Sequence, residues 1–116
     1  MTAEQFDIAI ARDFSLYPGG RFPRHGEGNG EDFRNQHLVP ALQTGKFVRV
    51  IFDDAFGYPA SFLEEAFGGL VRSGWDLHDL KERLTLTASV PSDQVYVDEA
   101  WQYMEDEAER SSSGVH

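Results

Sequence analysis

Cysteine is absent from the 116-residue chain, which excludes disulfides, thiolate chemistry and cysteine-ligated zinc. No apolar run is long enough to span a bilayer, and the polar residues 1–5 do not resemble a signal peptide. Basic residues are scarce: 10 lysines and arginines stand against 20 aspartates and glutamates, for a formal net charge of −10. Such a surface repels phosphates, so we do not expect nucleic acid as a partner. The missing cysteine, signal peptide and membrane span predict a cytoplasmic protein without a membrane partner.

The residues that are present are those of one globular domain. Hydrophobic residues make up 41% and charged residues 26%, and this length supports one modest core. We expect a single domain over residues 1–110 and a flexible tail over residues 111–116.

An acidic run precedes this tail. It has no base before Arg110, and its members are Asp98, Glu99, Glu105, Asp106, Glu107 and Glu109. The run predicts either a solvated helix face or an acidic docking surface for a basic partner.

Three segments have the pattern of β-strands. Apolar and polar or small residues alternate over 6–11 and 84–89, and the segment 47–52 is rich in β-branched and aromatic residues. Residues 50–52 are apolar on both faces, which predicts a central strand covered on both sides. A short segment around Arg21–Phe22 is a candidate for a further strand.

Helical patterns alternate with these strands. Asn29 is a candidate N-cap for a helix that runs to about Leu42, and Pro40 is expected to distort its last turn. A second helix begins at Ser61 with an apolar face, and a last one runs from about Ser92 or Asp93 to Arg110. A short helical turn is expected over residues 76–83. This order predicts an α/β fold with a small mixed sheet flanked by helices.

Ser61 stands at the boundary between the central strand and the second helix. Glu64 follows three residues later, so the pair predicts a capping box in which the serine hydroxyl accepts from the Glu64 amide. The second hypothesis is a phosphorylation switch. A phosphate at the positive end of the helix is favourable, whereas repulsion from Glu64, Glu65 and Asp54 opposes it.

Other catalytic and metal-binding patterns are missing around these residues. Ser61 lacks the G-x-S-x-G frame of a serine hydrolase. The histidines show no ligand spacing that carboxylates complete; they are His25, His37, His78 and His116. We therefore expect no catalytic residue, no metal and no cofactor.

The glycine-rich loop before the first helix is a second candidate site. Arginines, glycine amides and a helix start lie close in sequence there, and such groups together bind anions. The candidate anion-binding residues are Arg21, Arg24, His25, Gly28, Asn29 and Gly30. The spacing fits neither a P-loop nor a dinucleotide fingerprint. A flexible turn whose arginines pair with local acids is the other interpretation.

Three motifs resemble a known family. "YPGGRFPRHGEGNGEDFRNQHLVPAL", "VRVIFDD" and "ASFLEEAFGGLV" occur in this order between about Phe6 and Val71, and they resemble the bacterial STAS-like domain of unknown function. In the wider STAS class, anti-sigma-factor antagonists have a mixed sheet flanked by helices and carry a phosphorylated serine at the start of the helix after the central strand. By position, Ser61 matches that serine. Ala60 replaces a serine that the STAS-like family often has, and Asn29 replaces a second one.

The resemblance implies a non-enzymatic, cytoplasmic regulatory module that binds a protein partner and is switched at Ser61. The partner it implies is a histidine-kinase-like ATPase or a sigma-regulating protein. The predicted contact residues are Ser61, Phe62, Glu64, Glu65 and Gly68. The alternative from another functional class is a phosphate or nucleotide sensor, or a minor enzyme, that uses the loop from Arg21 to Gly30. The sequence leaves the oligomeric state open.

Overall fold

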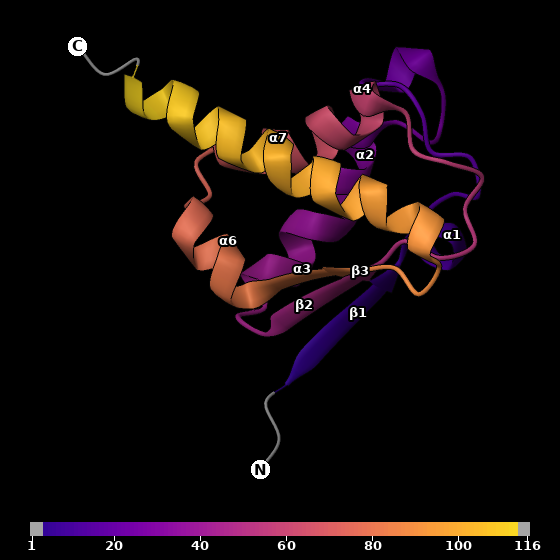
Figure 1. Cartoon of the computed structure of the whole chain (residues 1–116), viewed down its shortest axis with the longest axis horizontal. Helices are drawn as coiled ribbons and strands as arrows, with labels where there is room; N and C mark the ends of the chain where they lie inside the picture. The colour runs from indigo at the N-terminus through magenta and orange to yellow at the C-terminus, as the bar shows by residue number, and fades with distance from the viewer. Residues whose placement is uncertain (1–3, 114–116) are drawn as a thin grey trace.

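A parallel sheet lies at the base of the molecule. The computed structural model describes residues 4–113, and the structural statements below concern that part of the chain. Its strands are β1 (Gln5–Ala9), β2 (Phe47–Ile51) and β3 (Leu84–Thr87), with β2 in the centre (Figure 1). The predicted α/β class, with helices packed on a sheet, is confirmed.

The sheet differs from the prediction in strand direction. Both described pairings are parallel, whereas a mixed sheet was expected. The segment around Arg21–Phe22 forms a bend and not a strand, so it adds no antiparallel partner.

The first long helix is built from α2 (Gly30–Phe33), η2 (Arg34–Leu38) and α3 (Val39–Gln43). Asn29 caps it as predicted, because its side-chain oxygen accepts from the Asp32 amide at 2.9 Å. The η2 segment is π-helical and ends two residues before Pro40, which has no N–H and whose ring crowds the preceding turn. The distortion is therefore found in the middle of the helix, one turn earlier than expected.

The second long helix follows the same plan. It consists of α4 (Ala60–Leu63), the π-helical η3 (Glu64–Gly68) and α5 (Gly69–Arg72). Its predicted apolar face is confirmed: Phe62, Leu63, Ala66, Phe67 and Leu70 are completely buried.

The remaining helices are α1 (Ile10–Asp13), η1 (Pro23–His25), α6 (Leu77–Arg83), η4 (Pro91–Asp93) and α7 (Gln94–Ser113). The long helix α7 crosses the outer side of the helical layer (Figure 1). It continues through Ser113, past the expected end at Arg110, and residues 114–116 of the predicted tail lie outside the described residues. None of the helices in residues 4–113 is both long and apolar enough to cross a bilayer.

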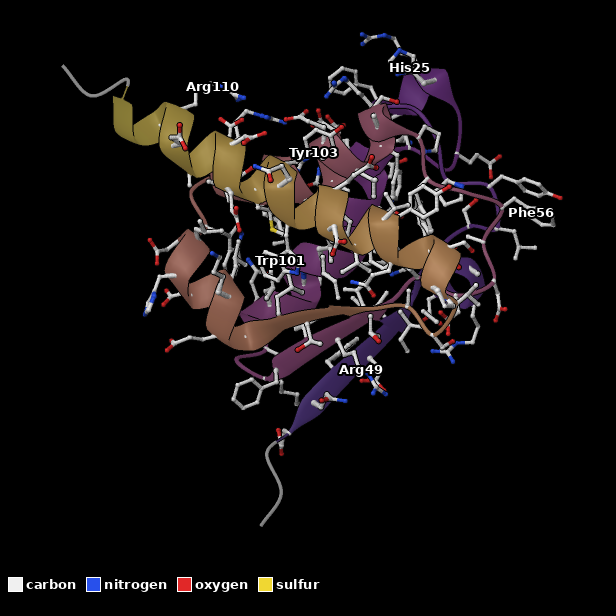
Figure 2. All side chains as sticks on the ribbon, viewed as in Figure 1. His25, Arg49, Phe56, Trp101, Tyr103 and Arg110 are labelled. Carbon is white, nitrogen blue, oxygen red and sulfur yellow. The ribbon has the colours of Figure 1, made fainter. Side chains whose placement is uncertain are left out.

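The helices gather on one side of the sheet, and its other face is open (Figure 1). Val48 and Val50 point into the core, whereas Arg49 points to the open face and pairs with Asp7 at 2.8 Å (Figure 2). The prediction that the central strand is covered on both sides is therefore wrong. Val50 and, just beyond the strand, Phe52 are completely buried, whereas Ile51 between them is only partly buried.

Candidate functional site

The two candidate regions that lie far apart in the sequence meet in the structure. The start of α2 crosses the second long helix at Gly30, where an added Cβ atom would lie 2.8 Å from the Phe62 carbonyl oxygen. The Arg21 guanidinium reaches across this crossing to the carboxylate of Glu64. The glycine-rich loop and the Ser61 helix thus form one continuous surface.

The predicted capping box at Ser61 is wrong. Pro59 is the N-cap, the helix begins at Ala60, and no side chain caps it. The Pro59 carbonyl accepts the first amides of the helix, and the Glu64 amide donates to carbonyls of the helix itself. The Ser61 hydroxyl makes no hydrogen bond within residues 4–113. The carboxylate of Glu64 pairs with arginines instead.

Burial divides the predicted contact residues into two groups. Phe62 is completely buried, Glu65 is 7% exposed, and Gly68 packs 3.5 Å (from the position of an added Cβ) from the Tyr103 carbonyl of α7. Ser61 and Glu64 are partly exposed, so only these two of the predicted set reach the surface.

An extended ion network links this surface to α7. Its members are Arg21, Arg34, Arg72, Arg110, Glu64, Glu65 and Glu107. Arg72 lies at its centre, with Nη1 2.8 Å from Glu64 Oε2 and 2.9 Å from Glu107 Oε1. Burial opposes the ionisation of Glu64, but hydrogen bonds from Arg72 and Arg21 outweigh it and hold the Glu64 pKa below its usual value. The carboxylate of Glu64 is therefore charged at neutral pH and fixes the loop against the helix.

The most buried link of the network joins the two π-helical segments. The Arg34 Nη1 atom lies 3.0 Å from Glu65 Oε2 and also donates to the Glu65 carbonyl. Gly69 makes room for this guanidinium, since an added Cβ atom would lie 2.1 Å from Arg34 Nη1. Gly69 therefore permits the close approach of Arg34 to the Ser61 helix.

The candidate anion-binding residues are held by contacts within the protein. Arg21 is engaged by carboxylates, and the Arg24 guanidinium lies 4.8 Å from the ring centre of Phe22. The His25 Nδ1 atom accepts from the amides of Arg21 and Phe22, and Asn29 is completely buried. His25 lies at the outer end of the loop (Figure 2).

Gly28 and Gly30 occupy crowded places in this loop. A Cβ atom on Gly28 would lie 2.5 Å from the Tyr17 carbonyl oxygen, and Gly30 meets the helix crossing described above. The loop is therefore a packed turn in which glycine is needed for space.

A cavity of about 390 Å³ opens between α1 and α2. Its lining residues are Asp13, Phe14, Ser15, Glu27, Asp32, Gln36 and His37. Neither here nor elsewhere in residues 4–113 do three or more histidine or carboxylate side chains gather as a metal-binding group would require.

Sequence reasoning did not identify Arg34, Arg72 and Glu107 as members of the network. One signal was present: Glu107 continues the inner stripe of α7 at helical spacing from Ala100 and Met104, and it is 6% exposed. An acid in a buried stripe requires a cation nearby. Of the predicted acidic run, Glu107 therefore belongs to the interior, while Asp98 and Asp106 are exposed.

Comparison with known proteins places this arrangement in a family. The chain matches the family model described as a STAS-like domain of unknown function over residues 29–94, more than half of its length. The matched residues run from the Asn29 cap, through β2, the Ser61 helix and β3, to the first residue of α7. No curated protein and no solved structure matched in the same comparisons. The resemblance inferred from the motifs is confirmed, and the chain belongs to the STAS-like domain family of unknown function.

Proposed function

We propose that this chain is a non-enzymatic regulatory module of the cytoplasm that binds a protein partner through the surface around Ser61. Phosphorylation of Ser61 changes that contact. The observation that carries the proposal is the placement of Ser61. It is partly exposed in the first turn of the helix after the central strand, and its hydroxyl makes no hydrogen bond within the described residues.

The neighbours of Ser61 give a phosphate a physical effect. A kinase would transfer the γ-phosphoryl group of ATP to Ser61 Oγ, with release of ADP and the hydroxyl proton. Glu64 and Glu65 follow at helical spacings of three and four residues, on the same side of the helix. The phosphate would repel Glu64 and compete with it for the Arg21 guanidinium, which the loop supplies. Modification would therefore alter both the charge and the loop on this surface.

The family supports a regulatory role, and the wider class suggests the partner: a histidine-kinase-like ATPase or a sigma-regulating protein. The alternative, a phosphate or nucleotide sensor in the loop from Arg21 to Gly30, has less support. Arg21 is paired with carboxylates and Arg24 stacks on a ring, so neither arginine is held toward a vacant anion position.

The test compares Ser61→Ala and Ser61→Asp with the unmodified chain for stability and for capture of the native partner. Because Ser61 is not a cap, the free energy of unfolding of both variants should lie within about 0.5 kcal/mol of the wild-type value. Ser61→Ala should retain the partner, and Ser61→Asp should lose it.

Ser111 provides the matched control, since it is an exposed serine in α7. Ser111→Ala and Ser111→Asp should bind like wild type. Mass spectrometry of the chain purified from its native cells should find phosphate on Ser61. Phosphate at other serines only, or full binding by Ser61→Asp, would contradict the switch.

A further inference from the structure

A second, aromatic cavity lies at the carboxyl ends of the strands. It measures about 320 Å³, and its lining residues are Tyr17, Pro18, Phe56, Gly57, Tyr58, Pro59 and Tyr96. These residues come from the segments that follow β1, β2 and β3. Crevices outside the carboxyl ends of parallel strands are the common ligand sites of open α/β sheets.

The rings of this cavity are held in place although two of them are largely exposed. Tyr17 and Phe56 stack with ring centres 4.8 Å apart and planes 6° apart, yet they are 69% and 72% exposed. The Phe56 amide donates to the Leu16 carbonyl at 2.9 Å, which ties the two loops together. Phe56 lies at the outer edge of the molecule, on the side where α7 begins (Figure 2).

The floor of the cavity is rigid. The Tyr58 hydroxyl donates to the Phe52 carbonyl at 2.7 Å, and the Tyr58 ring meets Tyr96 edge-on at 5.2 Å. Gly57 adopts a φ of 120°, a backbone conformation that favours glycine, beside the Tyr96 hydroxyl. The aromatic faces are thus preformed and need little ordering when a ligand binds.

The charged residues in the segments that line the cavity are all acidic. The three lining segments lie in stretches without a lysine or arginine, namely residues 13–20, 50–71 and 84–109. Asp53 and Asp54 precede the lining residues of the second loop, and Asp93 lies one helical turn before Tyr96. Burial first, and then these three carboxylates, raise the pKa of Tyr58, which places them within electrostatic reach of it. Hydrogen bonds from Ser89 lower the pKa of Asp53 and keep that carboxylate ionised.

We propose that this cavity binds the lysine or arginine side chain of a basic segment of a protein partner. Aromatic faces attract cations through their quadrupole, and the surrounding carboxylates add to that attraction. Further exposed apolar side chains follow the strands at the same edge: Leu16, Val90 and Val95 are 45%, 46% and 50% exposed. A peptide segment covers such an extended surface, whereas a small free cation fills only the cavity. This assignment goes beyond the proposed function and does not depend on Ser61.

NMR titration of the full chain with blocked peptides tests the assignment. The probes are acetyl-Ala-Arg-Ala-Arg-Ala-amide, its lysine and glutamate counterparts, and choline as a free cation. The arginine and lysine peptides should shift the amide resonances of residues 16–19 and 53–58. Added salt should weaken the binding of both peptides. The glutamate peptide should shift none of these amides. Equal shifts with the glutamate peptide, or binding of choline without binding of either basic peptide, would overturn the assignment.

Variants at Phe56 separate cation binding from simple apolar contact. Phe56→Tyr should bind the arginine peptide like wild type, whereas Phe56→Leu should bind it about 3- to 30-fold more weakly, the loss of one cation–π contact. Both should fold, because the ring is mostly exposed. Phe47→Leu is the matched control: this ring is 46% exposed at the opposite end of the sheet, and its loss should leave binding unchanged. If Phe56→Leu binds the arginine peptide as tightly as wild type, the aromatic face is not the binding element and the proposal fails.

Discussion

Phe67 and Phe56 are the same residue type in opposite environments. Phe67 is completely buried and contacts the rings of Phe33 and Phe52, with ring centres 6.2 and 5.8 Å away. Phe56 is mostly exposed. The first ring contributes to stability through packing, and the second remains available for binding.

Substitution of Phe67 by alanine should lower the free energy of unfolding by about 3–5 kcal/mol, because it removes buried apolar area and leaves a cavity. Urea denaturation measures the change. Phe56→Ala is the matched control and should change stability by no more than about 0.5 kcal/mol. Equal losses in the two variants would show that the ring of Phe67 does not pack as described.

The Arg34–Glu65 pair is the most buried ionic contact of the network, with side chains 10% and 9% exposed. Glu65→Ala should destabilise the protein by about 3–5 kcal/mol, since it leaves the buried Arg34 charge without this carboxylate. The double variant Arg34→Met with Glu65→Leu should recover most of the lost stability, because it removes both charges. Thermal and urea unfolding check both values. A double variant as unstable as the single one would mean that the pair is needed for packing and not only for charge compensation.

The two long helices share an element-scale feature, a π-helical segment in the middle of each. Such segments are rare in proteins and are frequent at functional sites. Here they lie against each other through Arg34 and Glu65, close to the surface that carries Ser61. The Arg34–Glu65 ion pair thus joins the two π-helical segments directly.

Glycines set how closely these helices approach, and two of them should respond differently to alanine. Gly30→Ala should destabilise by about 1–3 kcal/mol, because the new methyl group meets the backbone of the other helix at 2.8–3.0 Å. Gly68→Ala should be close to neutral. Its methyl group meets the side chain of Glu64 at 3.0 Å and no backbone atom closer than 3.5 Å, and alanine favours the helix by about 1 kcal/mol. The check is the difference in urea midpoint between the two variants; a similar midpoint would contradict the close crossing at Gly30.

At the scale of the whole molecule, acids outnumber bases two to one. In the part of the chain that the structure describes, the helices cover only one face of the sheet. Parallel sheets are usually covered on both faces. Here Arg49 and Asp7 make the open face polar through their ion pair, which allows contact with water.

The ion network links the loop, both long helices and α7, so its response to pH concerns the whole molecule. The Glu64 pKa is lower in the folded state than its usual value near 4.5, so the folded state binds fewer protons than the unfolded state as pH falls toward that value. The stability from Glu64 is therefore complete above about pH 4.5 and is lost as pH falls through the lower folded pKa. At neutral pH, Glu64→Gln should cost about 1 kcal/mol, since the side chain is partly solvated.

Stability curves of wild type and Glu64→Gln, measured by urea denaturation between pH 7 and pH 3, check this prediction. The difference in free energy of unfolding between wild type and Glu64→Gln should stay constant down to about pH 5 and become smaller at lower pH. Glu99→Gln on α7 is the control and should follow wild type throughout. A gap between wild type and Glu64→Gln that does not change with pH would show that Glu64 acts through packing alone.

The sequence by itself determined the elements of this protein. The alternation of residues 84–89, the apolar stripe from Phe62 to Leu70 and the Asn29 cap are local patterns. Each depends on neighbours within a few residues along the chain, so each could be predicted. The family motifs likewise lie in continuous segments.

Only the tertiary structure decided how those elements are used. Pro59 replaces Ser61 as the cap, because the extended backbone before the helix places the proline carbonyl on its first amides. The sequence pattern was compatible with solvent-facing side chains for Glu64 and Glu65. In the structure they pair with Arg21 and Arg34, which lie in the loop before the other long helix and on that helix. The aromatic cavity joins segments that follow three different strands. The spacing of apolar residues along a helix or strand predicts which of its sides is buried. It does not predict which distant segment covers that side, because this contact is set by the packing of the whole chain.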